Sequence, residues 1–168
     1  MAILFGKLPA HGDFIARGLS DADTERLDDF LSASLSAAAM VDGFDDLYAL
    51  APVWRFVTNI GGEAVCGVLA PSIDRVGRQF PILAGVMAGE DAGLRIDACE
   101  AQLYQAFAEG LDADALFARL SATPEPQGAP PSSGWWLEDS ERTVIVRVDG
   151  EWPVDVMTRM IEAARQMS

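Results

Sequence analysis

The chain has 168 residues, of which half are hydrophobic and 23% are charged, a composition typical of a folded protein rather than a disordered one. This length fits one compact domain, so we expect residues 1–168 to form a single unit. With 26 acidic against 12 basic residues, the formal net charge is −14, which disfavours nucleic acid and anionic membrane surfaces as partners.

The sequence predicts neither a membrane span nor a secretory signal. The apolar runs "VCGVLA" and "PILAGVMA" are far shorter than the roughly 20 residues that a membrane helix needs. The N-terminal stretch "MAILFGKLP" has no basic region ahead of its apolar run. We therefore expect a cytoplasmic protein without membrane insertion. Cys66 and Cys99 lack CxxC spacing, which predicts two reduced, buried thiols.

In the first half of the chain, strands surround one long helix. A short strand "AILF" precedes an irregular turn, and a helix is expected after Ser20, which can cap its acidic first turn. "FDDLYALAP" predicts a short helical turn that ends before Pro52. "VWRFVTNI" and "EAVCGVLA" predict a hairpin around Gly61 and Gly62, and "ILAGVMA" predicts a further strand after the loop "PSIDRVGRQFP".

In the second half, helical periodicity runs from Asp97 to about Leu120 in two pieces, with a break near Gly110 and a possible new cap at Asp112. Residues 121–134 contain four prolines and predict an internal loop. "WWLED" and "RTVIVRVDG" predict two last strands, and "PVDVMTRMIEAARQ" predicts a final helix.

These elements predict an α/β (α+β) fold in which a central mixed, mainly antiparallel sheet is flanked by helices on both faces. Because side chains alternate along a strand, we expect one of Trp135 and Trp136 to face the core and the other to face outward or lie under a helix. Core packing of both rings is the alternative.

Enzymatic chemistry has few candidates, because His11 is the only histidine and any Ser-His-Asp or Cys-His arrangement would need it. Ser72 follows Pro71 in "APSID" and does not stand in a nucleophile signature. Lys7 is followed by Leu8 and Pro9, so it does not belong to a phosphate-binding loop. We expect no enzymatic activity and no cofactor.

A metal site is a weak possibility. His11 and Asp13 could share an ion with Asp74, but one imidazole with scattered carboxylates lacks the spacing of known metal sites. The simpler interpretation places His11 in a turn and lets Asp13 bind nearby backbone N–H groups. We therefore expect no metal.

The loop "PSIDRVGRQFP" places Asp74, Arg75 and Arg78 within five positions. The planar guanidinium of arginine suits carboxylates and phosphates, so the loop could bind an anion or a partner protein. It could also be an internal clamp, in which Asp74 pairs with an arginine and fixes the loop. The residues by themselves leave both interpretations open.

Three motifs in order give a resemblance. "FGKLPAHGDF", "APVWRF" and "PSIDRVGRQFP" resemble the family patterns G-K-L-P-x-R-G-D-F, A-P-x-W-R-F and P-S-V-D-R-V-G-R-x-F-P of the TagF (also called ImpM) proteins of type VI secretion. His11 stands where arginine is frequent in that family. The motifs cover mainly the first half of the chain, and "SGWW" resembles a late tryptophan pair.

The resemblance implies a regulator that restrains type VI secretion after translation and acts with the forkhead-associated scaffold protein of that system. It also implies an α/β architecture with a central antiparallel sheet and no established catalytic activity. Nothing in the sequence indicates the oligomeric state.

We predict that the motif loops around Lys7, His11 and Asp13 and around Asp74, Arg75 and Arg78 meet at one edge of the sheet. In this hypothesis Lys7 and the two arginines form a basic patch that orients a partner. One alternative is a small-ligand or anion-binding protein, or a hydrolase, with a polar pocket around His11, Asp13, Asp74 and Arg75. A third interpretation is a purely structural subunit of the secretion assembly.

Overall fold

The computed structural model describes residues 1–167. The elements are β1 (Ala2–Gly6), β2 (Ile15–Arg17), α1 (Asp21–Ala38), α2 (Phe44–Tyr48), β3 (Trp54–Ile60), β4 (Glu63–Ala70), β5 (Ile82–Met87), α3 (Ala92–Glu109), α4 (Ala113–Ser121), β6 (Gly134–Glu138), β7 (Val144–Asp149) and α5 (Val156–Met167).

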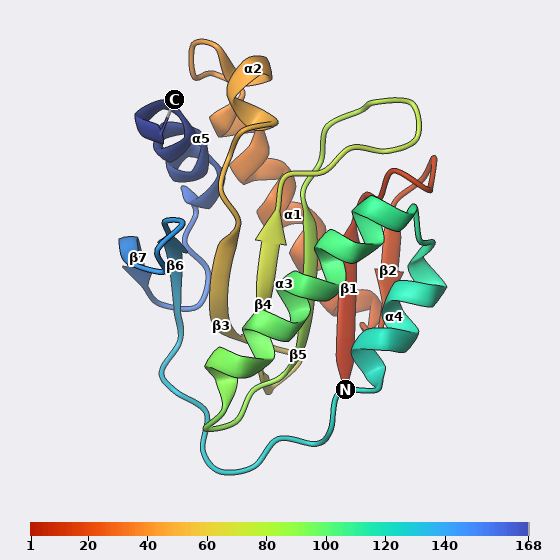
Figure 1. Ribbon diagram of the computed structural model, residues 1–168. Helices are drawn as coiled ribbons and strands as arrows, with labels where there is room; N and C mark the ends of the chain where they lie inside the picture. Colours follow the sequence, from red (N-terminus) through yellow and green to blue (C-terminus); the bar gives the residue numbers. More distant parts are fainter. Residues whose placement is uncertain (168) are drawn as a thin grey trace.

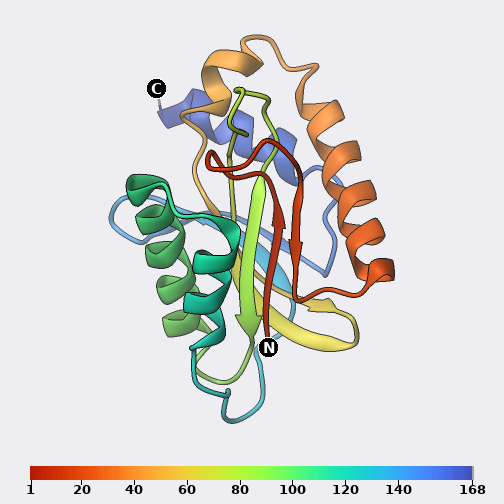
Figure 2. The same ribbon diagram turned by 90° about the vertical axis from the view of Figure 1, so that its right-hand side faces the viewer.

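The strands form one seven-stranded sheet in the order β2-β1-β5-β4-β3-β6-β7. Every neighbouring pair is antiparallel, so the expected fold class is confirmed and no pair of these strands is parallel. Helices α3 and α4 cover one face, and α1 and α5 cover the other (Figures 1 and 2). The sheet therefore separates two apolar cores, one under each helical layer.

The local signals for helix ends hold in the structure. The Ser20 hydroxyl accepts the Asp23 N–H at the start of α1, and the Asp112 carboxylate accepts the Ala115 N–H at the start of α4. Gly110 ends α3 in the left-handed conformation. None of the helices within residues 1–167 is long and apolar enough to cross a membrane.

Strand signals also hold, with two differences. Gly61 and Gly62 both have positive φ, as a two-residue hairpin turn requires. The short edge strand β2 was not expected, because three residues show no alternating pattern. Helix α3 begins at Ala92 rather than at Asp97. Its buried residues Ala92 and Ile96 continue the apolar stripe of Cys99 and Leu103, although Gly93 has a low helix propensity.

Glycines let the central strands approach closely. Gly67 in β4 lies opposite Gly85 in β5. A Cβ added to Gly67 would lie 2.0 Å from the carbonyl oxygen of Ala84, so no larger residue fits there without a shift of the backbone.

Candidate functional site

The first motif loop begins where β1 meets β5. Gly6 ends β1 with a φ of +130°, and a Cβ there would lie 2.0 Å from the Pro81 carbonyl oxygen. Only glycine combines this conformation with this approach. The chain then turns, with the His11 N–H donating to the Leu8 carbonyl oxygen at 3.0 Å, and returns as β2.

The second motif loop connects β4 to β5 and is organised by one carboxylate. The Asp74 Oδ1 atom accepts the backbone N–H groups of Val76 at 3.1 Å and Arg78 at 2.9 Å. The Asp74 N–H donates to the Arg78 carbonyl oxygen at 3.1 Å. Gly77 supplies the positive φ that closes this turn. Asp74 therefore shapes the loop from within.

The two loops meet at the second oxygen of the same carboxylate. Asp74 Oδ2 lies 3.1 Å from Lys7 Nζ and 2.6 Å from Arg78 Nε. Arg78 Nη2 also donates to the Gly12 carbonyl oxygen at 2.6 Å. We call Lys7, Asp74 and Arg78 the loop clamp. The sequence allowed either a binding site or an internal clamp for this loop, and the contacts of these three residues are those of an internal clamp.

Burial and charge act in opposite directions on the central carboxylate. Asp74 is 1% exposed, and burial alone would raise its pKa. The Arg78 backbone N–H and guanidinium, the Lys7 ammonium and the Val76 N–H outweigh that effect and hold the pKa of Asp74 well below its usual range. The carboxylate stays ionised at neutral pH and keeps both loops in place.

Lys7 corrects part of the sequence hypothesis. Its side chain was expected in an exposed basic patch with Arg75 and Arg78. Instead Lys7 is 7% exposed and its charge is taken up by Asp74, while Arg78 is exposed but held by the clamp. Of the three cations, Arg75 is the one whose side chain makes no hydrogen bond or ion pair within residues 1–167.

Buried hydrogen bonds between Tyr48 and Ser72, which we call the Tyr48–Ser72 relay, support the loop clamp, and the sequence did not predict them. The Tyr48 hydroxyl donates to the Ser72 carbonyl oxygen at 3.0 Å and accepts the Ser72 N–H at 3.1 Å. The Ser72 hydroxyl donates to the Lys7 carbonyl oxygen at 2.7 Å. Burial raises the pKa of Tyr48, so its hydroxyl remains a donor. No pattern near Tyr48 predicts this contact across the fold.

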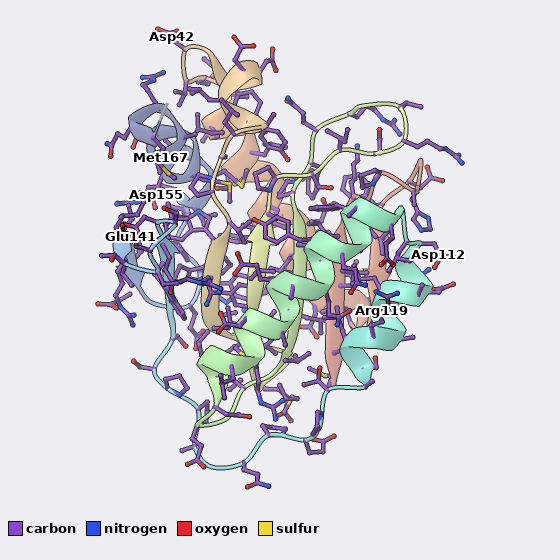
Figure 3. All side chains as sticks on the ribbon, viewed as in Figure 1. Asp42, Asp112, Arg119, Glu141, Asp155 and Met167 are labelled. Atoms are coloured by element: carbon purple, nitrogen blue, oxygen red, sulfur yellow. The ribbon has the colours of Figure 1, made fainter. Side chains whose placement is uncertain are left out.

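In the first loop, His11 contacts another part of the protein, whereas Asp13 lies on the surface. His11 Nε2 accepts the Ala113 N–H at 2.9 Å, which ties the loop to the start of α4; Figure 3 labels the neighbouring cap residue Asp112 there. Asp13 is exposed, and its side chain makes no hydrogen bond or ion pair within the described chain. Residues 1–167 hold no group of three His, Cys, Asp or Glu side chains placed for a metal ion.

Two members of the alternative polar pocket already bind other groups of the protein. His11 points its acceptor at α4, and both Asp74 oxygens are occupied by the loops. The cavity beside the second loop, of about 270 Å³, is lined by other residues: Pro9, Tyr48, Ala49, Pro71, Ser72, Ile73, Gln79 and Phe107. It is mostly apolar and opens next to the loop.

An exposed surface surrounds the clamp. We call it the motif tip and define it as Asp13, Phe14, Ile73, Arg75 and Val76. Val76 is 71% exposed and Phe14 is 53% exposed. The Phe14 ring packs against Phe80, with 4.7 Å between ring centroids, so this aromatic side chain is held in place. The motif tip combines apolar groups with one unpaired cation on a rigid base.

The middle motif lies in the sheet rather than in these loops. Trp54 is fully buried and donates its indole N–H to the Val156 carbonyl oxygen at 2.8 Å. Arg55 faces the α3 side and pairs with Asp97, Glu100 and Glu138. Burial alone would lower the pKa of Arg55, but these carboxylates raise it. This motif joins β3 to both helical layers and to β6.

The tryptophan pair and the cysteines take the places predicted for them. Trp135 is fully buried, while Trp136 is partly buried and packs against the α3-side core. Cys66 and Cys99 are free and buried. Burial raises the pKa of each thiol to about 12, so neither is a nucleophile at neutral pH.

Comparisons with known proteins agree with the motifs. The family model of the TagF N-terminal domain, described as type VI secretion system-associated, matches residues 4–123. A search of curated proteins gives no match. Among solved structures, the fold is similar to PA0076 from Pseudomonas aeruginosa PAO1, with a TM-score of 0.76 and 24% sequence identity over 96% of this chain and 94% of that one.

Proposed function

The chain belongs to the TagF family of type VI secretion system-associated proteins, and on that premise we propose that it is a non-catalytic regulator in the cytoplasm. It restrains secretion after translation by binding the forkhead-associated scaffold protein of the system. The motif tip is the surface that contacts this partner.

The observation that supports the proposal is that each motif loop has some residues in the loop clamp and others on the exposed motif tip. The loop clamp uses Lys7, Asp74 and Arg78 internally, and the Tyr48–Ser72 relay supports it. What remains exposed is a preorganised surface with apolar groups, Asp13 and the unpaired Arg75. A rigid surface loses little conformational entropy on binding, which favours affinity.

Charge gives the surface an orientation. The molecule carries a net charge of −14, so a free guanidinium at its tip is a local exception that an acidic group on the partner can recognise. Val76 beside it provides apolar area for the centre of a contact.

The test is a pulldown from native cytosol with the tagged chain and two variants, Arg75→Glu and Val76→Asp. We expect wild type to recover the scaffold and each variant to bind it at least about tenfold more weakly. Arg159→Glu is the matched control, because Arg159 lies on the surface of α5 and pairs only locally with Asp155.

All variants must melt within about 2 °C of wild type, as surface substitutions normally do. Scaffold recovery that is equal for wild type, Arg75→Glu and Val76→Asp would move the interface away from the motif tip. Failure of folded wild type to recover the scaffold would refute the proposed partner.

A further inference from the structure

The sheet has two edges, and they differ. At one edge, β2 has three residues, and Arg17 connects it to α4 through an ion pair with Asp114 at 2.9 Å. At the other edge, β7 has six residues and pairs with β6 alone among the described strands. Figure 1 shows β7 at the outer margin of the sheet. Its second side is therefore open to another strand.

The register fixes which backbone groups of β7 point outward. The Gly150 N–H donates to the Ser133 carbonyl oxygen, one position beyond the pair of Asp149 with Gly134. Hydrogen-bonded positions alternate along an antiparallel pair, so Val148 faces β6 with its N–H and C=O. The backbone groups of Arg147 and Asp149 then point to the open side.

The side chains of the same two residues carry opposite charges. Arg147 and Asp149 lie on one face of β7, with 48% and 85% of their side chains exposed, and within one chain Arg147 Nε donates to Asp149 Oδ1 at 3.1 Å. A partner strand with the same two residues can therefore exchange or extend this exposed ion pair. Val146 and Val148 lie on the other face and pack against the core under α1 and α5. The open edge thus presents an alternation of one cation and one anion beside free hydrogen-bonding groups.

We propose that β7 is the pairing edge of a homodimer, in which two copies meet antiparallel about a two-fold axis through Val148. Arg147 of each copy then lies opposite Asp149 of the other. These are the positions whose backbone groups point outward, so the same residues form the hydrogen bonds and two cross-strand ion pairs.

The two neighbouring pairing registers of the dimer would bring like charges together. A two-fold axis at Arg147 would place the two arginines opposite each other, and an axis at Asp149 would do the same with the aspartates. The β6–β7 register is irregular only between Leu137 and Glu138 of β6, which lie opposite the first residues of β7, so the part of β7 around Val148 is regular. Charge and hydrogen bonding therefore select one register.

A second copy fits this edge as a self-limiting partner. Two-fold pairing uses both β7 edges and leaves only the short β2 edges, so the assembly closes as a dimer instead of growing into a fibre. One short strand pair is a small interface, and we expect a dissociation constant in the micromolar range. This inference does not depend on scaffold binding.

The experiment measures mass against concentration by sedimentation equilibrium, from about 5 to about 500 µM, which brackets a micromolar constant. We expect wild type to move from 18.0 kDa toward twice that mass. Arg147→Glu and Asp149→Arg each place like charges across the axis and should weaken the dimer at least about tenfold. The double variant exchanges the charges and should restore it.

Two further measurements distinguish this pairing from a nonspecific effect. Arg159→Glu makes the same charge change on α5 and should leave the dimer intact. Val148→Cys should form an intermolecular disulfide on oxidation, because facing residues at such an axis have Cα atoms about 4.5 Å apart. A mass of 18.0 kDa at every concentration, or a dimer that the double variant does not restore, would overturn the proposal.

Discussion

The hydroxyl of Tyr48 offers the clearest test of how the candidate site is held together. Tyr48→Phe removes one oxygen atom and keeps the ring, which is 2% exposed. That oxygen accepts the Ser72 N–H and donates to the Ser72 carbonyl oxygen. The substitution therefore leaves two buried backbone groups of Ser72 without this partner, and the same serine supports Lys7.

The expected magnitude follows from those two bonds. Each buried hydrogen bond contributes a net of about 0.5–1.5 kcal/mol, and a backbone group left unpaired costs toward the upper end of that range or beyond. We expect Tyr48→Phe to lower the free energy of unfolding by about 2 kcal/mol. For a chain of this size, the melting temperature should fall by about 4–8 °C.

The assay is equilibrium unfolding in urea followed by tryptophan fluorescence, with the free energy extrapolated to water. Tyr104→Phe is the matched control, since Tyr104 is 50% exposed and should change stability by less than about 0.5 kcal/mol. If Tyr48→Phe is as mild as Tyr104→Phe, the relay does not support the loops and the reasoning about a preorganised site is wrong.

Three other outcomes are expected. Because the pKa of Asp74 is lower in the folded than in the unfolded chain, its contribution to stability is complete above about pH 5 and is lost progressively as the pH falls through the unfolded value toward the folded one. Between about pH 5 and pH 3 wild type should therefore lose stability more steeply than Asp74→Asn, and parallel curves would contradict this. Cys66 and Cys99 should resist alkylation at pH 8 until urea unfolds the chain, as mass spectrometry can show, whereas rapid labelling of the native protein would contradict their burial. Gly67→Ala should destabilise the sheet by about 1–3 kcal/mol or more, because its Cβ meets the backbone of β5, while Gly93→Ala on the open surface of α3 should stabilise the helix by up to about 1 kcal/mol; equal urea midpoints for the two variants would exclude the close strand approach.

Sequence patterns with a short range predicted much of the fold. Ser20 and Asp112 cap their helices, and Gly61 and Gly62 turn their hairpin, because these signals act within a few residues. The alternation that buries Trp135 is also local. The motifs identified the family, which the match to residues 4–123 confirms.

Long-range pairing decided the candidate site. The sequence shows Asp74 beside two arginines, but it does not show that Lys7, in a loop distant along the chain, contacts the same oxygen atom as Arg78. That contact exists because β1 pairs with β5 and the loops at their ends meet. It buries Lys7, holds the exposed Arg78 in the loop clamp and leaves Arg75 for a partner.

For strand β7 too, the sequence and the tertiary structure determine different features. Composition and alternation determined that β7 is a strand, but only the strand order places it at the margin, and only its register decides that the backbone groups of Arg147 and Asp149 face outward. The sequence by itself determined the elements, since local geometry and burial pattern depend on neighbouring residues. The tertiary structure decided which charges are used inside the fold and which remain exposed, because that depends on segments that only folding brings together.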